Sequence, residues 1–86
     1  MNSANYILQI TYDAEFDILS LKYASNANAT AKELGPYIII YTDDLTGETT
    51  TVTIMDFVRR FDELEPFLLD IPFNINLNDV LQRIAS

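Results

Sequence analysis

The chain has 86 residues, carries 13 acidic against five basic side chains, and contains neither cysteine nor histidine. The missing cysteine excludes disulfides and thiolate chemistry, and the missing histidine removes the commonest general base and metal ligand. A net charge of −8 opposes binding to phosphate backbones. It suits a basic protein partner, or it serves solubility alone.

The length predicts one domain, residues 1–86, with a β-rich part over 1–57 and a helical or extended part over 58–86. Residues 6–12, "YILQITY", and 17–23, "DILSLKY", alternate apolar and polar positions, the pattern of half-buried strands. The chain must reverse between them. The polar stretch 24–36 predicts a loop with a short helical turn at 31–34.

Residues 36–42, "PYIIIYT", predict a strand covered on both faces. A turn follows, with Asp44 opening it and Gly47 closing it. Residues 48–57 predict the return strand. Four strands in sequence predict an antiparallel meander, whose face away from the helices would still carry Ile38 and Ile40.

After Asp56 the apolar period becomes helical, with Asp56 as the N-cap and Pro66 ending or kinking the helix. The segment 67–75 predicts extended packing. A second helix over 77–84 would be capped by Asn76 or Asn78. The predicted fold is α+β: a four-stranded antiparallel β-meander with one or two short C-terminal helices packed on one face.

Asp13, Glu15 and Asp17 resemble the start of a calcium loop. Such a loop needs Gly at its sixth and Glu at its twelfth position, which here are Ile18 and Ala24. The three acids therefore predict a structural hairpin turn. No metal, cofactor or catalytic residue is expected, because the acids of the second turn have no base or nucleophile beside them.

The basic pair Arg59–Arg60 would either grip a carboxylate or phosphate or lie on a solvated helix face. The residues of a possible partner surface are Asp13, Glu15, Asp17, Asp43, Asp44, Arg59 and Arg60.

Residues 9–58 resemble a bacterial family of small proteins, domain of unknown function number 2283. The family's Tyr-Asp-x-x-x-Asp-x-Leu hairpin is matched by Tyr12, Asp13, Asp17 and Leu19, and its acidic turn with glycine by Asp44 and Gly47. The chain departs from the pattern at Thr50–Thr51, where members carry a second Gly, and in continuing over 60–86. The family has no established activity. The resemblance implies an antitoxin-like protein, since members are suspected partners of small basic toxin candidates.

The leading functional expectation is a non-enzymatic, cytoplasmic, acidic binding protein, antitoxin-like toward a basic protein. The cytoplasm is expected because the sequence shows no signal peptide or membrane span. One alternative is an acidic nucleic-acid mimic of the phage inhibitor type, and another is a small enzyme of unknown chemistry. No direct nucleic-acid or membrane binding is expected. The abundance of apolar residues over 57–84 predicts a homodimer or a hetero-complex with its interface in that third of the chain.

Overall fold

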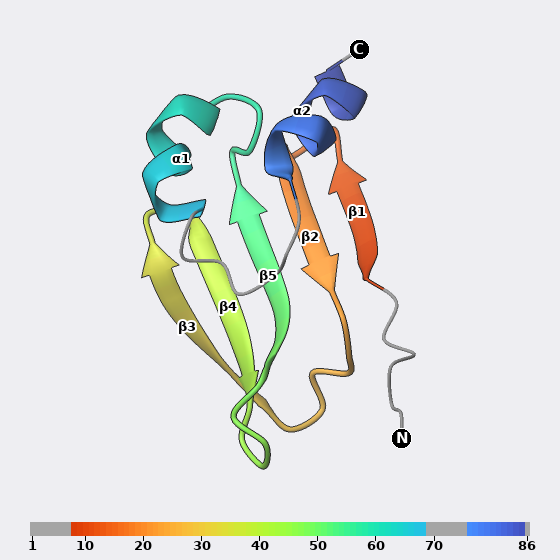
Figure 1. Cartoon of the computed structure of the whole chain (residues 1–86), viewed down its shortest axis with the longest axis vertical. Helices are drawn as coiled ribbons and strands as arrows, with labels where there is room; N and C mark the ends of the chain where they lie inside the picture. Colours follow the sequence, from red (N-terminus) through yellow and green to blue (C-terminus); the bar gives the residue numbers. More distant parts are fainter. Residues whose placement is uncertain (1–7, 69–75, 86) are drawn as a thin grey trace.

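The computed structural model describes residues 8–68 and 76–85, and the statements below concern those residues. They form one five-stranded antiparallel sheet and two helices on the same side of it (Figure 1). The strand order across the sheet is β1-β2-β5-β4-β3. The elements are β1 (Gln9–Asp13), β2 (Ile18–Lys22), β3 (Ala29–Gly35), β4 (Ile38–Asp43), β5 (Thr49–Met55), α1 (Phe61–Leu68) and α2 (Leu77–Ala85).

The expected α+β class is therefore confirmed, whereas the count of four strands was wrong. The fifth strand, β3, occupies part of the stretch predicted to be a loop, and the helical turn expected at 31–34 is strand instead. Most of β3 is exposed on both faces, so its sequence lacks the apolar alternation that marks a half-buried strand. Pairing with β4 stabilises the extended conformation of β3, from Ala29 opposite Asp43 to Gly35 opposite Ile38.

The order of the strands also differs from a simple meander. Strand β2 pairs with β5, and the chain crosses from β2 to the far edge of the sheet before it returns through β4. The connection is tied to the sheet by Asn26, whose Oδ1 accepts hydrogen bonds from the hydroxyls of Thr50 (2.7 Å) and Thr51 (2.9 Å). Thr50 is the extra residue where the β4–β5 register shifts, which is the geometry of a β-bulge.

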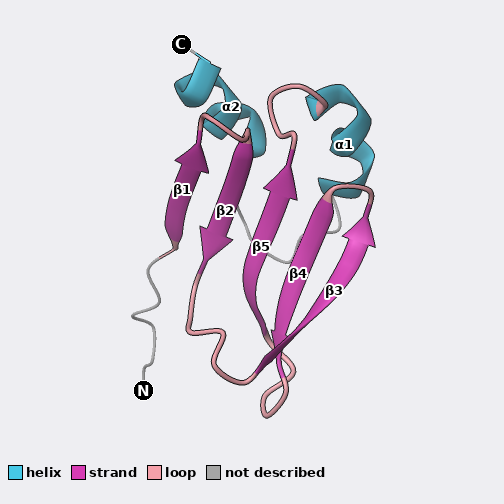
Figure 2. Cartoon of the chain, turned by 180° about the vertical axis from the view of Figure 1, so that it is seen from behind, coloured by secondary structure: helices cyan, strands magenta, loops and turns pink. Residues whose placement is uncertain are grey.

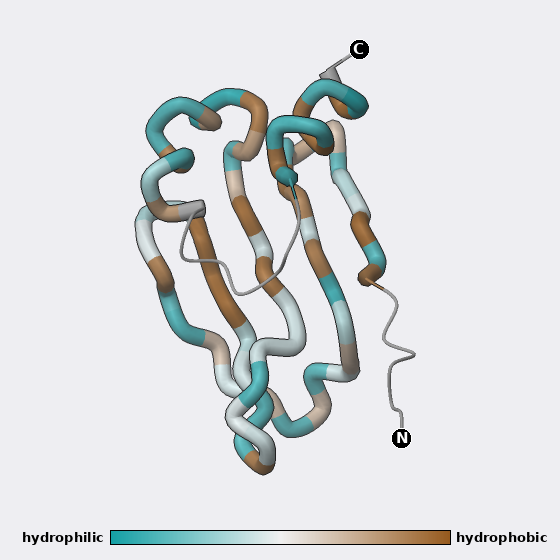
Figure 3. Tube along the Cα trace, in the orientation of Figure 1, coloured by the Kyte–Doolittle hydropathy of each residue, from teal (hydrophilic) through white to brown (hydrophobic). Residues whose placement is uncertain are grey.

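The hydrophobic core lies between the helices and one face of the sheet, and its apolar strand segments are brown in Figure 3. Ile38 is fully buried there and Ile40 packs against it, so the expectation that they lie on the opposite face was wrong. In β4 it is Ile39 and Tyr41 that face away. The buried residues are Leu19, Leu21, Ile38, Val52, Ile54, Phe57, Phe61, Leu64, Leu77 and Val80.

The helix boundaries correct two further expectations. Asp56 does not cap α1, which begins five residues later at Phe61, and Pro66 does not end it, because α1 continues to Leu68. For α2 the cap is Asn76, whose Oδ1 accepts the amides of Asn78 (3.0 Å) and Asp79 (3.3 Å). The extended segment expected at 67–75 lies largely outside the described residues. Neither described helix is long and apolar enough to cross a membrane.

Candidate protein-binding surface at the helical end of the sheet

Three connections meet at the end of the sheet where the helices lie (Figure 1). They are the β1–β2 turn, the β3–β4 turn and the segment 56–60 that leads from β5 to α1, and together they are called the turn surface below. The opposite end holds the β4–β5 turn. The molecule measures 38 Å along its longest axis, so the two ends are separate surfaces.

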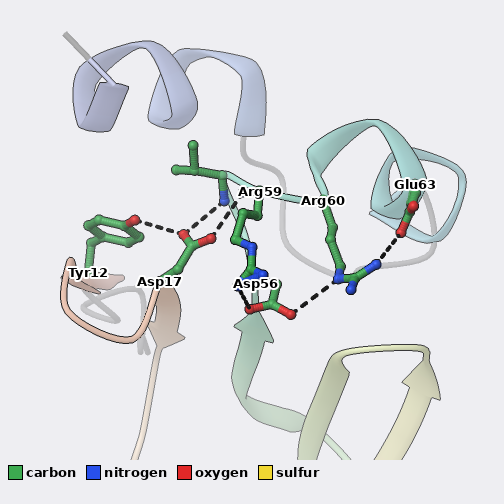
Figure 4. Close-up of polar contacts among 7 residues, drawn as sticks. Tyr12, Asp17, Asp56, Arg59, Arg60 and Glu63 are labelled. Carbon is green, nitrogen blue, oxygen red and sulfur yellow. Dashed lines mark hydrogen bonds and ion pairs between the residues drawn. The ribbon is translucent and has the colours of Figure 1, made fainter.

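Asp17 is the residue that joins the β1–β2 turn to segment 56–60 (Figure 4). Its carboxylate accepts hydrogen bonds from the Val58 amide (2.9 Å), the Arg59 amide (3.0 Å) and the Tyr12 hydroxyl (2.7 Å). Its own carbonyl accepts the Phe57 amide at 3.1 Å. A carboxylate that receives several N–H and O–H donors fixes the groups that donate to it. Asp17 therefore holds the two connections in one arrangement.

These contacts perturb two proton equilibria. Partial burial alone would raise the pKa of the Asp17 carboxyl, but the amides of Val58 and Arg59, the Tyr12 hydroxyl and the Arg59 charge lower that pKa below its ordinary value. The hydrogen bond to Asp17 raises the pKa of Tyr12 to about 12, because loss of the phenolic proton would place two negative charges together. The pair is thus an ionised carboxylate with a protonated phenol at neutral pH.

Segment 56–60 is also held against the β3–β4 turn. The Tyr37 carbonyl accepts the Met55 amide at 2.8 Å, and the Arg60 guanidinium lies 4.7 Å from the centre of the Tyr37 ring. Arg60 also pairs with Asp56 (3.2 Å) and Glu63 (3.0 Å). Arg59 approaches Asp56 more loosely, at 3.8 Å. The Arg60 guanidinium therefore contacts Tyr37, Asp56 and Glu63 of its own chain.

The backbone of the turn surface is strained at three places. Among the described residues, the non-glycine residues with positive φ are Asp17 (55°), Tyr37 (67°) and Asp56 (54°), one in each connection. Asp tolerates this region through its short polar side chain, whereas an aromatic residue does so at a cost. Such strain persists only where surrounding contacts enforce it, and it gathers at functional sites.

Apolar side chains are nevertheless left exposed on this rigid support. Phe16 is 63% exposed at the tip of the β1–β2 turn, and Val58 and Tyr37 are each 38% exposed. Acidic residues lie in the same part of the chain fold: Asp13 ends β1, Glu15, Asp17 and Asp56 belong to the connections, and α1, which follows segment 56–60, adds Asp62, Glu63 and Glu65. Exposed aromatic and aliphatic groups with a charged rim are the composition of a protein interface.

The seven residues predicted as a partner surface are divided by the structure. Asp13, Glu15, Asp17, Arg59 and Arg60 lie on the turn surface, whereas Asp43 and Asp44 lie at the opposite end. Asp13 is structural, since its Oδ1 accepts the amides of Glu15 (3.0 Å) and Phe16 (3.2 Å). The Glu15 carboxylate has no ion-pair or hydrogen-bond partner among the residues that the structure describes.

In the β4–β5 turn, as in the β1–β2 turn, an aspartate side chain accepts the amides of the turn. Asp43, not Asp44, opens it: its Oδ1 accepts the amides of Leu45 (2.7 Å) and Thr46 (3.1 Å), and Gly47 adopts a φ of 78°. The Asp44 carboxylate accepts the Thr30 hydroxyl at 2.7 Å and so ties the turn to β3. In the described parts of the chain, no three acidic side chains come together as metal ligands would.

Sequence reasoning missed the apolar members of the turn surface, Phe16, Tyr37 and Val58. Phe16 carried a usable signal, because a large aromatic residue inside an acidic turn has no role in the turn itself. Tyr37 and Val58 carried none, since their exposure depends on how distant segments meet.

Comparison of the chain with models of known protein families, with curated proteins and with solved structures found no match.

Proposed function

We propose that the chain is a non-enzymatic acidic binding protein that engages a basic protein through the turn surface, in the manner of a cytoplasmic antitoxin. The observation that carries the proposal is the exposure of Phe16, Val58 and Tyr37 on a rigid support rimmed by carboxylates. The apolar groups would supply contact area and the carboxylates would steer a positively charged partner. If the predicted resemblance to domain of unknown function number 2283 holds, it implies the same class of partner.

The distribution of charge favours a protein partner over nucleic-acid mimicry. A mimic needs carboxylates in rows at roughly the spacing of phosphates. The described carboxylates lie mainly in turns and on α1, and the strands carry the basic Lys22 and Lys32 beside the acidic Glu33, with Asp13 and Asp43 at strand ends. A basic protein that presents an apolar pocket beside lysines or arginines fits this arrangement better.

Binding measurements on two matched variants test the proposal. The wild-type chain, Phe16→Ser and Leu45→Ser are immobilised, basic proteins are captured from cells of the source organism, and the purified partner is titrated against each chain. Leu45 is the control, because it is 82% exposed but lies in the opposite turn. Phe16→Ser should weaken binding about tenfold or more, as loss of an aromatic anchor does, and Leu45→Ser should leave it unchanged.

Equal loss in the two variants, or capture of an acidic partner, would contradict the proposal. The salt dependence gives an independent check, because an acidic rim attracts a basic partner less strongly when charges are screened. The affinity for the partner should therefore fall as salt rises.

The non-enzymatic part of the proposal is tested by a screen for esterase, phosphatase and nuclease activity. We expect none above background in purified protein. Activity that survives purification and disappears in the Asp43→Asn, Asp44→Asn double variant would overturn it.

A further inference from the structure

Strands β1 and β3 are the two edges of the sheet (Figure 2). An edge strand has backbone N–H and C=O groups without a neighbouring strand, and these groups can pair with a strand of another chain, whereas charged side chains and register shifts oppose such pairing. Strand β3 carries Lys32 and Glu33 and a register shift between Glu33 and Gly35. Strand β1 keeps an unbroken register with β2, and its only charged residue is Asp13 at its end. The β1 edge is therefore the more open of the two.

The outward-facing backbone groups of β1 belong to its even-numbered residues. The Tyr23 amide donates to the Thr50 carbonyl at 2.8 Å, so the odd-numbered residues along β2 turn their backbone groups toward β5. The even-numbered residues of β2 then face β1, where the register places the odd-numbered residues of β1 opposite them. The backbone groups of Ile10 and Tyr12 are left pointing outward from the edge. The Ile10 side chain is also 45% exposed.

Two copies of β1 can pair along their whole length. When the strand Gln9–Asp13 lies antiparallel against itself, Thr11 lies opposite Thr11 of the second copy, on a two-fold axis. Ile10 then lies opposite Tyr12, so the two residues with outward backbone groups exchange hydrogen bonds with each other. Pairs of threonines and pairs of a β-branched with an aromatic residue stabilise neighbouring strands. Gln9 lies opposite Asp13, so no like charges face each other.

The same arrangement is unfavourable at the other edge. Strand β3, Ala29–Gly35, paired against itself is centred on Lys32 and places two lysines opposite each other, which destabilises the pairing of the strands. In the β1 pair the Asp13 carboxylates of the two copies are separated by about 13 Å along the strands. That separation exceeds the screening length of about 8 Å at physiological ionic strength. A second copy of the chain therefore fits the β1 edge and not the β3 edge.

We propose that β1 is the dimerisation edge of this chain, across which two copies join their sheets into one continuous antiparallel sheet with Thr11 on the two-fold axis. The axis is perpendicular to the sheet, so the helices of both copies lie on one face. Helix α2 and the β1–β2 turn lie at the same end of β1 (Figure 1). The antiparallel arrangement places those of the two copies at opposite ends of the junction. The dimer therefore presents two turn surfaces.

This interface is distinct from the turn surface, and the two respond oppositely to salt. One pair of strands buries less area than a stable interface does, so the dimer is weak and depends on concentration. Each chain carries −8, and salt screens the repulsion between the copies. The dimer should therefore tighten as salt rises, whereas binding of a basic partner should weaken. Failure of either proposal leaves the other standing.

Sedimentation velocity on matched variants tests the dimer. The samples are the wild type, Thr11→Lys and Ala31→Lys, over micromolar to millimolar protein. Thr11→Lys places two ammonium groups opposite each other on the axis and should weaken dimerisation about tenfold or more. It also reduces the net negative charge of the chain, so general repulsion cannot cause the loss. Ala31→Lys adds the same charge to β3 and should leave dimerisation within about twofold of wild type. Both positions are exposed, and thermal unfolding checks that the fold survives.

Disulfide trapping tests the register independently, because the chain has no cysteine of its own. Thr11→Cys should form a covalent dimer in a glutathione redox buffer, since residues opposite each other without mutual backbone hydrogen bonds have Cα atoms about 4.5 Å apart, which a disulfide spans. Gln9→Cys should stay monomeric, because its two copies are about 13 Å apart along the strands.

A wild-type chain that stays monomeric at millimolar concentration and about 1 M salt, where the screening length is about 3 Å, overturns the dimer. Equal weakening by Thr11→Lys and Ala31→Lys, or equal trapping of Thr11→Cys and Gln9→Cys, overturns its place at the β1 edge.

Discussion

Carboxylates of the same type serve different purposes according to where their donors come from. Asp13 and Asp43 accept amides two and three residues ahead, so each stabilises only its own turn. Asp17 accepts amides 41 and 42 residues away and therefore stabilises the tertiary structure. Its removal should affect the whole fold, whereas removal of a neighbouring free carboxylate should not.

The first prediction concerns that difference. Asp17→Asn keeps a residue that tolerates positive φ but loses the charge, and should lower the free energy of unfolding by about 1–2 kcal/mol. Asp17→Ala also strains the backbone and should cost about 2–3 kcal/mol. Glu15→Gln is the control in the same turn and should stay within about 0.5 kcal/mol. Urea denaturation measures all three, and equal effects at 15 and 17 would contradict the role given to Asp17.

Low pH should remove the stabilisation that the ionised Asp17 carboxylate gives to the folded state. Its pKa is lowered in the folded state, so its stabilisation is complete above the unfolded value of about 3.9 and is lost as the pH falls through the folded value. The difference in unfolding free energy between wild type and Asp17→Asn should be constant above about pH 5 and shrink below about pH 4. A difference that persists unchanged at lower pH would mean that the charge is not responsible.

The raised pKa of Tyr12 predicts that the protein loses stability at high pH, whereas the lowered pKa of Asp17 predicts a loss at low pH. The folded pKa of Tyr12, about 12, exceeds the unfolded value of about 10, so its stabilisation is complete below pH 10 and is lost as the pH rises toward 12. Wild type should lose stability over this range more steeply than Tyr12→Phe. The ultraviolet titration difference between the two proteins should show one phenol with a midpoint of about 12. A midpoint near 10 would show that Asp17 does not hold the phenolic proton.

At the scale of elements, α1 docks on the sheet through the close approach of Phe67 to Gly35. A methyl group at Gly35 would lie 2.6 Å from Cδ1 of the Phe67 ring. Gly35→Ala should therefore destabilise the fold by about 1–3 kcal/mol through overpacking. The same change made in a Phe67→Ala background should cost much less, because the ring is gone. Urea denaturation of the four proteins gives the coupling, and an equal cost in both backgrounds would contradict this packing.

Gly47→Ala is the matched control for that cycle. Gly47 has a φ of 78° and nothing within 4 Å of an added Cβ, so the substitution costs only backbone strain, about 1–2 kcal/mol. That cost should be the same with and without Phe67. A dependence on Phe67 would mean that the substitution acts through something other than local strain.

The elements differ in how far the sequence could predict them. The alternation of 17–23, the helical stripe of 77–84 and the N-cap Asn76 are local signals, and the structure confirms elements at those places. Strand β3 has polar residues on both faces, and the pairing of β2 with β5 joins segments about 30 residues apart. Neither leaves a periodic pattern, because both depend on contacts made only after the chain has crossed the sheet.

At the scale of the whole molecule, the apolar residues that motivated an interface in the C-terminal third are used in the core. Phe57, Phe61, Leu64, Leu77 and Val80 are buried, and Phe67, Leu81 and Ile84 pack against them. Leu69, Ile71, Phe73 and Ile75 lie outside the described residues. Assembly stays a prediction, and the burial of these residues removes the reason to place its interface among them.

The turn surface, too, could be predicted only in part. Its acids, and Phe16 among them, are visible in the sequence as a cluster at 13–17. Val58 comes beside that cluster only through the hydrogen bonds of Asp17, and Tyr37 is joined to segment 56–60 only through the Arg60 guanidinium. Equally acidic Asp43 and Asp44 belong to the other end of the molecule. The tertiary structure therefore decides which acids can share one partner.

Site-specific photo-crosslinking tests the role of the turn surface most directly. A benzophenone amino acid replaces Phe16 in one chain and Leu45 in another, both being exposed turn positions at opposite ends, and each chain is irradiated in cells of the source organism. The account predicts a discrete adduct with a basic protein from position 16 and none from position 45. An adduct from position 45 alone, or none from either position in cells that express the chain, would contradict it.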